Sequence, residues 1–348
     1  MKYSRIISGI LVIATTVSVL KAGNPQRAGS AAAPELLINP WARAAGWGGL
    51  NIASTRGLES SFINVAGLAH TKSTEIIFSN TQWLMGSGIN INAAGIAQRV
   101  GPNGVMGLSV SSFDYGEWDI TTDAQPEGGI GTISPSALTL GLSYAQKFTN
   151  TIYGGVTLKV FNQAINNLSA TAIMADAGVQ YITGEDDRIT FGITLKNIGS
   201  NLSFGGDGSS ITLPVPQNSH SQAYEQRAAS FELPSQLSLG MTYDFLFEEK
   251  TVRLTPGFSF QSNSFEKDSY TLGAELGWRK FISLRAGYSF FDNRVDEIRT
   301  TALTGLSTGI TFQAPLAKGG DTYFAIDYAY RSTNPFNGIH TISARFDL

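Results

Sequence analysis

The chain has 348 residues, of which 15% are charged, with a net charge of −3 and a mean hydropathy of zero. This balance, with no long run of Lys or Arg, gives no reason to expect a nucleic-acid partner. The absence of Cys excludes disulfides, thiolate metal sites and a lipidated N-terminal cysteine. The 38 glycines and 11% aromatic residues suit alternating β-strands better than membrane helices.

Residues 1–22 predict a cleaved secretory signal peptide. Lys2 and Arg5 precede an apolar run that ends at Leu20, and the small residue Ala22 comes just after it. The alternative is a membrane anchor helix, but the run is shorter than the roughly 20 residues that a span requires. An exported chain without such a helix is periplasmic, secreted or a β-barrel.

Residues 23–72 differ from the rest of the mature chain. Residues 23–35 contain turn formers and small residues and predict a flexible leader. Residues 36–72 show no alternation, so they cannot form a barrel wall, and we expect them to form a plug inside or beneath a barrel. The residues expected to shape this plug are Trp41, Arg43, Gly46, Trp47, Gly48 and Gly49.

From Thr74 to the C-terminus, apolar and polar residues alternate with a period of two, which is typical of strands with one apolar face. In residues 270–279, Tyr270 and Trp278 stand near the two ends of the apolar face, as in strands with aromatic belts, while Glu275 points the other way. The pattern predicts an all-β fold, a transmembrane antiparallel β-barrel of about 14 strands over residues 73–348. The predicted strands are 74–83, 89–99, 105–113, 137–147, 152–163, 170–183, 188–198, 236–245, 252–261, 270–279, 282–291, 302–312, 322–331 and 339–348.

The connections and the inward positions support the barrel. The two long insertions, residues 114–136 and 199–235, fall on the same predicted side, as expected for outer loops. The inward positions carry charges of both signs, which a wet or plugged lumen tolerates and a dry core does not. The alternative is a soluble β-sandwich, which is hard to build from so many one-faced strands. The inward charged residues are Lys159, Asp176, Lys196, Arg253, Glu275, Arg279, Arg285, Asp327, Arg331, Arg345 and Asp347.

Two motifs resemble a known family. The run Ala42–Gly49 (ARAAGWGG), together with Phe62–Ala69 (FINVAGLA) after a short gap, resembles the N-terminal signature of PorV/PorQ-type outer-membrane proteins, which are similar to the FadL fatty-acid transporters. Val65 stands where that family usually has Pro. The resemblance implies a FadL-like barrel with a plug, integral to the outer membrane of a Gram-negative bacterium.

The resemblance also implies a role in type IX secretion. The expected partners are other secretion proteins, the C-terminal domains of secreted cargo, and outer-membrane lipid, but no nucleic acid. Cargo is expected to dock on the outer loops, where aromatic residues stand among polar ones. The candidate partner-binding residues are Tyr115, Trp118, Tyr224 and Phe231. These aromatic residues could equally pack the loops on themselves.

Catalysis and passive transport are the competing functions. The three His residues lack the spacing of a metal site, and no Gly-x-Ser-x-Gly motif occurs, so we expect no enzyme activity and no cofactor or metal. A FadL-like channel for hydrophobic small molecules such as fatty acids remains the stronger alternative. Such a channel needs an apolar pocket, whereas Phe161 and Tyr153 are the exceptions among largely polar inward positions.

Overall fold

The structure, a computed structural model, describes residues 23–214, 220–247, 251–279, 281–291, 294–295, 298–299, 301–316 and 322–348. The predicted signal peptide, residues 1–22, lies outside the described residues.

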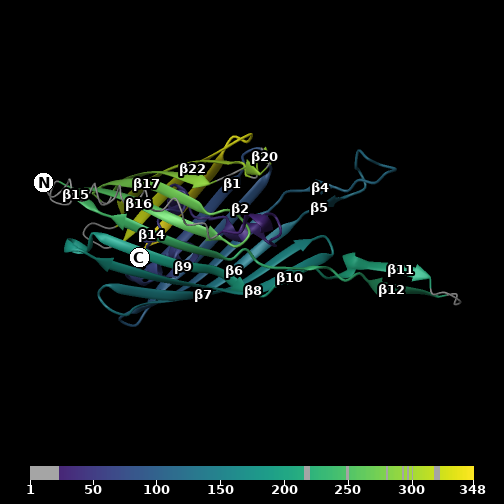
Figure 1. Cartoon of the computed structure of the whole chain (residues 1–348), viewed down its shortest axis with the longest axis horizontal. Coiled ribbons are helices and arrows are strands. Elements are labelled where there is room, and N and C mark those ends of the chain that lie inside the picture. The colour runs from purple at the N-terminus through teal and green to yellow at the C-terminus, as the bar shows by residue number, and fades with distance from the viewer. Residues whose placement is uncertain are drawn as a thin grey trace.

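A closed antiparallel β-barrel dominates the molecule (Figure 1). Its sheet has 15 strand segments, but β14 (Gln236–Tyr243) and β15 (Phe245–Phe247) are two parts of one strand interrupted at Asp244, because both pair with the same neighbour. The wall therefore has 14 strands, and the predicted fold class is confirmed. The other wall strands are β1 (Thr74–Trp83), β2 (Ile89–Val100), β3 (Gly104–Asp114), β6 (Ser136–Lys147), β7 (Ile152–Ile165), β8 (Leu168–Thr183), β9 (Ile189–Gly199), β16 (Val252–Asn263), β17 (Ser269–Trp278), β18 (Ile282–Phe291), β21 (Leu303–Pro315), β22 (Tyr323–Thr333) and β23 (Ile339–Asp347).

The ring closes where the last strand meets the first. In this pairing Glu75 of β1 stands opposite Asp347 of β23, and β14 pairs with β16 on the far side of the sheet. Each of the 14 predicted strands is present. The largest difference between a predicted and an observed strand end is three residues: the strand predicted to end at residue 312 is β21, which continues to Pro315. Period-two alternation therefore located the wall.

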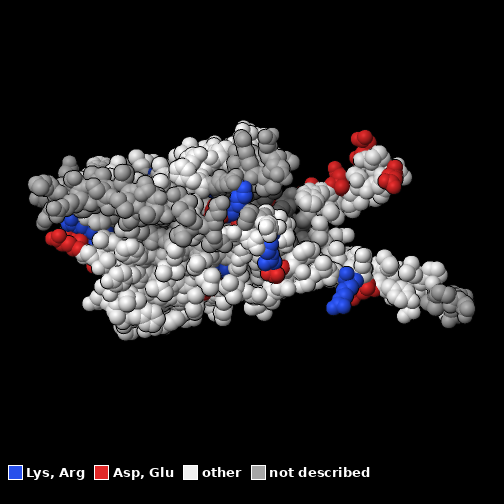
Figure 2. Space-filling model, viewed as in Figure 1, with Lys and Arg blue, Asp and Glu red and all other residues white. Residues whose placement is uncertain are grey.

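The two faces of the wall differ as the alternation requires. Outward side chains are apolar and exposed, such as Leu158 (59% exposed) and Ile173 (63%), whereas the inward Thr157 and Asp176 are buried. On the visible side of the barrel, charged atoms are sparse between its two ends (Figure 2). Among the described residues, no helix is long and apolar enough to cross a membrane.

The two ends of the barrel are unlike. Short connections, such as residues 101–103 and 148–151, lie at one end, which we call the turn end. Two hairpins project far beyond the other end, which we call the loop end, and they belong to the insertions 114–136 and 199–235 (Figure 1). The strands outside the wall are β4 (Trp118–Asp119), β5 (Thr132–Ile133), β10 (Leu202–Ser203), β11 (Ser210–Pro214), β12 (Ser221–Glu225), β13 (Ser230–Phe231), β19 (Arg294–Val295) and β20 (Ile298–Arg299).

The N-terminal segment runs through the lumen from the loop end to the turn end. At the loop end, Ala32 N–H donates a hydrogen bond to the carbonyl of Glu232, and at the turn end Arg99 Nε donates to the carbonyl of Thr71. We call residues 23–38 the leader and residues 39–71 the plug. The helical turns inside the lumen are η3 (Pro34–Leu37), α2 (Ala42–Ala45), α3 (Ser60–Ile63) and η4 (Val65–His70). Outside it, η2 (Pro25–Arg27) lies at the exposed start of the leader, and η5 (Glu185–Asp187) and η6 (Asp207–Ser209) lie in wall connections.

A β-bulge interrupts the pairing of β8 with β9. The register shifts between Ala175 and Ala177, and Asn197 takes a positive φ of 59°. The extra residue turns both Lys196 and Asn197 toward the lumen, where both are buried. Strict alternation after Lys196 would have placed Asn197 on the outer face.

Candidate functional site

The plug is tied to the inner face of the wall by hydrogen bonds. Ala42 N–H donates to Ser343 Oγ at 3.1 Å, and Asn64 Nδ2 donates to the carbonyl of Val179 at 3.1 Å. The Asn64 side chain also accepts a hydrogen bond from the N–H of Ala66, and in this way Asn64 caps the N-terminus of η4. Because these bonds join opposite sides of the barrel to one short segment, the plug has a single position in the lumen.

The plug residues singled out from the sequence occupy two kinds of position. Trp41 and Trp47 are 2% and 3% exposed and fill space between the plug and the wall. Arg43 forms an ion pair with Glu59 (Nε to Oε1, 3.4 Å) and donates a hydrogen bond to the carbonyl of Arg56 at 2.5 Å. Arg43 therefore holds two turns of the plug together.

The three plug glycines serve the backbone. Gly48 and Gly49 have φ values of 68° and 79°, a conformation that favours glycine, and they make the tight turn after α2. Gly46 ends α2 and packs directly on Gly309 of β21. The turn and this contact hold the segment against the wall.

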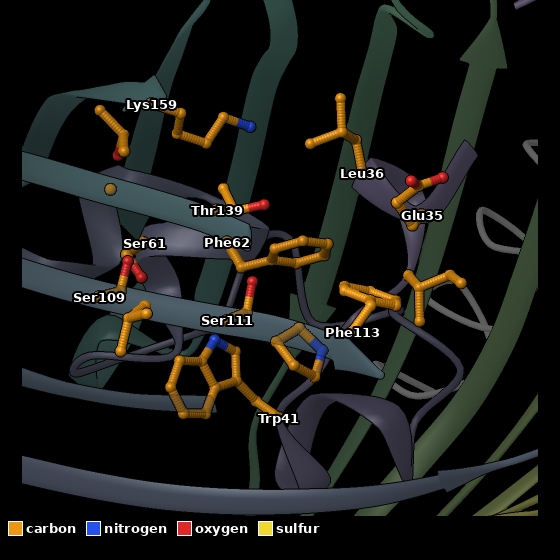
Figure 3. A pocket seen from close by; sticks show the side chains of 15 residues that line it. Glu35, Leu36, Trp41, Ser61, Phe62, Ser109, Ser111, Phe113, Thr139 and Lys159 are labelled. Carbon is orange, nitrogen blue, oxygen red and sulfur yellow. The ribbon is translucent and has the colours of Figure 1, made fainter. Parts of the chain in front are cut away.

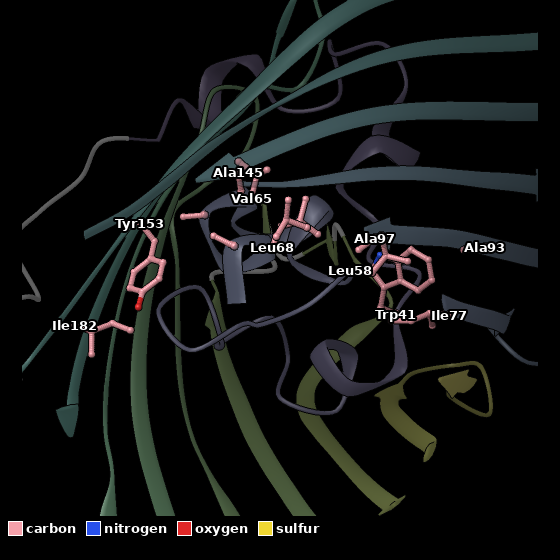
Figure 4. Close-up of a cluster of buried hydrophobic side chains, with 13 residues drawn as sticks. Trp41, Leu58, Val65, Leu68, Ile77, Ala93, Ala97, Ala145, Tyr153 and Ile182 are labelled. Atoms are coloured by element: carbon pink, nitrogen blue, oxygen red, sulfur yellow. The ribbon is translucent and has the colours of Figure 1, made fainter. Parts of the chain in front are cut away.

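An apolar cluster joins the plug to the strands around β1 (Figure 4). Leu58 and Leu68 of the plug, both fully buried, pack with wall residues that include Ile77. Tyr153, which the sequence marked as an inward exception, closes one side of the cluster beside the ring of His70, at 4.2 Å between centroids. This cluster anchors the turn-end half of the plug.

A second apolar cluster occupies the loop-end half of the lumen on the side of β2, β3, β6, β7 and β8, and we call it the apolar chamber. The leader contributes Leu36 and Ile38, and the wall contributes Phe161, the other predicted exception, at 0% exposure. The chamber is defined by Ala33, Leu36, Ile91, Phe113, Ala137, Phe161, Ala170, Ala172, Met174, Leu202 and Leu233, with Ala32, Ile38, Trp83, Tyr115 and Phe204 packed against them.

A small cavity of about 40 Å³ lies beneath the chamber, and we call it the apolar cavity. Figure 3 shows Phe62, Phe113 and Trp41 around it, with Leu36 approaching from the leader and Lys159 from the wall. Its remaining lining comes mainly from small residues of β3 and β6, such as Ser111. The cavity is large enough for a few atoms beyond those that already fill the chamber.

One carboxyl group borders the apolar cavity. Glu35 is 5% exposed, and Gln163 Nε2 donates a hydrogen bond to its Oε1 at 2.9 Å. Burial raises the pKa of the Glu35 carboxyl, and it also raises the pKa of the neighbouring Tyr115 hydroxyl. Both shifts favour the uncharged form relative to the same group in water.

The leader is the main element that the sequence reasoning missed. Residues 23–35 were predicted to be flexible, yet Ala33 and Glu35 are buried, and η3 (residues 34–37) crosses the predicted boundary between leader and plug. The available signal was Pro34, which favours the first position of a helical turn, with the apolar Leu36 two positions later. The tertiary reason is that the closed wall surrounds the end of the leader and removes Ala33, Glu35 and Leu36 from water, whereas residues 28–30 stay exposed.

Ion pairs line the polar part of the wall. Lys159 Nζ lies 2.7 Å from Asp176 Oδ2 and donates to Asn197 Oδ1 at 2.5 Å. Glu275 pairs with Arg285 at 2.6 Å and also with Arg253. These predicted inward charges therefore pair within the lumen and stabilise the interior of the barrel.

A larger polar cavity of about 340 Å³ opens at the turn end. It lies between the plug and β9, β14 to β18, β21 and β23, and its lining includes six arginines and two carboxylates. Most of the arginines pair with carboxylates or donate hydrogen bonds. The lumen is thus apolar on the β2 to β8 side of the loop end and charged at the turn end. The charged lining residues are Arg43, Arg56, Arg253, Arg279, Arg285, Arg345, Asp244 and Glu275.

The four candidate partner-binding residues are not gathered in one place. Tyr115 is half-buried against the apolar chamber and stacks on Phe113, with 6.4 Å between ring centroids. Trp118, Tyr224 and Phe231 are 49%, 44% and 47% exposed on β4, β12 and β13. The structure thus leaves Trp118 exposed on one insertion and Tyr224 and Phe231 exposed on the other, and it turns Tyr115 inward.

Within the described part of the chain, no group of three or more His, Asp or Glu residues could hold a metal ion. His70 lies in the plug and His340 on β23, where its Nδ1 is 2.8 Å from the hydroxyl of Tyr328. His220 stands before β12 in the projecting insertion. The three histidines are therefore on three different elements.

No protein-family model matches this sequence, and no curated protein sequence matches it. Solved structures do match. The toluene transporter TbuX of Ralstonia pickettii superposes with a TM-score of 0.52 at 11% identity, over 89% of this chain and 97% of that chain. The fold is FadL-like. The toluene transporter TodX of Pseudomonas putida (TM-score 0.51, 13% identity, 86% and 97% coverage) and a FadL homologue of Pseudomonas aeruginosa (0.50, 10%, 88% and 98%) agree.

At this identity the likeness to FadL-type barrels establishes the fold alone. The matched proteins are transport channels, and the expectation that the chain is not an enzyme is consistent with them. None of these three neighbours is named as a secretion protein of the PorV/PorQ type.

Proposed function

We propose that the protein is an integral outer-membrane barrel of a Gram-negative bacterium that admits small hydrophobic compounds from the loop end. The exposed apolar residues of the outer face suit a lipid surround. Fold neighbours named as toluene transporters and as a monoaromatic hydrocarbon channel support a hydrophobic substrate.

The apolar chamber is the observation that carries this proposal. Apolar side chains from five or more wall strands converge there, and ligand sites for hydrophobic compounds are concave and mainly apolar. The leader residues Leu36 and Ile38 fill much of it now. A hydrophobic ligand would contact the same wall residues, Phe113 and Phe161, in place of those leader side chains.

Binding and uptake measurements test the proposal. Cells that make the wild-type protein should take up toluene faster than cells that do not, and the purified barrel should bind it saturably. Phe113→Ser, which places a hydroxyl in the chamber, should weaken binding by about tenfold. Trp118→Ser, on the projecting β4, should leave it unchanged. Equal binding by both variants, or no binding by the wild type, rules out this site.

A partner-binding role in type IX secretion is the second candidate function. The hairpins that project beyond the barrel, with the exposed Trp118 and Tyr224, favour it because aromatic residues among polar ones suit protein contacts. A tagged barrel isolated from native membranes in mild detergent should then bring down secretion proteins or cargo with a common C-terminal domain. Trp118→Ser with Tyr224→Ser should abolish this capture and spare toluene binding, which separates the two functions.

A further inference from the structure

A third cavity, of about 90 Å³, lies in the lumen between the plug and β9, β14, β16 and β22. Its plug side includes Asn39 and Phe62, and its wall side includes Lys196, Ser238 and Arg331. Of the described residues that line it, two are cationic and none is a carboxylate. We call it the cationic cavity.

The two cations lack carboxylate partners. Lys196 is 5% exposed, and its Nζ lies 3.8 Å from the centre of the Phe62 ring. The nearby carboxylate Asp176 is already paired with Lys159 at 2.7 Å. Across the described residues Arg331 makes no ion pair, and its buried Nε has no hydrogen-bond partner. Positive charge is therefore in excess around this cavity.

Unsatisfied polar atoms of the same residues add a second, independent observation. Asn39 Nδ2 and Arg331 Nε are buried donors without acceptors, and Ser238 Oγ, at 1% residue exposure, is also unpaired. A buried donor that lacks an acceptor costs free energy, which an acceptor placed in the cavity would recover. Amide and guanidinium N–H groups can only donate, so the missing group is an acceptor.

We infer that the cationic cavity binds an oxyanion, a carboxylate or phosphate group held between Lys196 and Arg331. Such a group is negative and rich in acceptors, which matches both the charge and the donors. The cavity exceeds the space needed for one water several times over. Phe62 lines this cavity and the apolar cavity, so the oxyanion is either a free ion or the head group of a molecule whose apolar part lies next door.

Calorimetric titration of the purified barrel, in an uncharged detergent and a buffer free of oxyanions, tests the inference. The probes are inorganic phosphate, decanoate and decanol. We expect saturable binding of phosphate or decanoate. Lys196→Gln and Arg331→Gln should each weaken it at least about tenfold, since a charged hydrogen bond is lost. Lys196→Arg should retain it.

Lys147→Gln is the matched control, because it removes one positive charge at the turn end of β6 and Lys147 does not line the cavity. It should bind as the wild type does. Phosphate binding identifies a free ion, whereas binding of decanoate alone, with decanol inactive, identifies a head group. No binding of either anion, or full binding by both Gln variants, overturns the inference.

A measurement on the unmodified protein covers the case in which a variant fails to fold. Phosphate or decanoate should raise the unfolding temperature of the wild type above its value in chloride at equal ionic strength, because a ligand of the folded state stabilises it. Equal temperatures in all three salts count against the site. Toluene binding, measured in parallel, reports on the proposed channel function separately, since toluene carries no charge.

Discussion

A Cβ atom added to Gly46 would stand 2.8 Å from the Cα atom of Gly309, and one added to Gly309 would stand 2.9 Å from Cα of Gly46. The end of α2 in the plug therefore touches the backbone of β21 in the wall. Side-chain carbons do not approach backbone atoms this closely, so the contact requires glycine on both sides. It fixes the distance between the plug and the wall.

Gly309→Ala should therefore destabilise the barrel, although alanine in a strand usually stabilises relative to glycine. Overpacking of this kind costs about 1–3 kcal/mol, which chemical unfolding would measure. Displacement of the plug should also raise ion conductance in planar bilayers. The control is Gly277→Ala on β17, where an added Cβ has its nearest neighbours at 3.8 Å. If both variants behave alike, the contact does not position the plug.

The buried pair of Lys159 and Asp176 provides a second prediction. Their side chains are 8% and 4% exposed, so removal of one leaves the other charged in a nearly dry site. Lys159→Met should cost about 3–5 kcal/mol, and Lys159→Met with Asp176→Leu should cost much less. Unfolding of the two single variants and the double variant gives the coupling free energy. Additive losses would mean that the two charges act independently.

His70 should make stability depend on pH. Burial, and then the nearby Arg56 guanidinium, lower the pKa of the His70 imidazole to about 3, from 6.5 in the unfolded chain. Because the folded pKa is depressed, His70 contributes stability that is present above about pH 6.5 and is lost as the pH falls towards 3. The unfolding free energy of the wild type should thus decrease between about pH 7.5 and 5.

His70→Gln is the comparison that isolates this contribution, because glutamine can still bond to Gln180 but cannot take up a proton. The variant should lose less stability than the wild type over the same pH interval. Parallel curves for the two proteins would show that other groups set the pH dependence.

The wall could be predicted from the sequence because a barrel imposes a local rule. Each residue faces either the lumen or the outside, so alternation gave the strands and the inward placement of Lys159 and Glu275. The bulge at Asn197 could not be predicted in this way, since one extra residue exchanges the inward and outward positions of the residues after it. The bulge allows the bond between Lys159 and Asn197, which joins residues 38 positions apart.

The candidate site was harder to predict because it is built from distant contacts. Glu35 meets Gln163 across 128 positions, and nothing in the composition of residues 23–35 indicates that pairing. Tyr115 is an aromatic residue in a predicted outer loop, which favours a contact with a partner, but its ring turns inward and stacks on Phe113. The inward positions were judged mostly polar, whereas the apolar chamber also depends on Leu36 and Ile38, which come from the leader.

Leu36→Ala tests the leader as the occupant of the chamber. Leu36 is 4% exposed, and its truncation should lower stability by about 2–5 kcal/mol through lost burial and an enlarged cavity. The same enlargement should strengthen toluene binding, because the ligand fills space that the leader filled before. Leu37→Ala is the control, since Leu37 lines the cationic cavity and lies outside the chamber cluster. Calorimetry should show a higher affinity for toluene, and chemical unfolding a lower stability, for Leu36→Ala alone. Weaker toluene binding in that variant would mean that Leu36 forms part of the ligand site and does not compete for it.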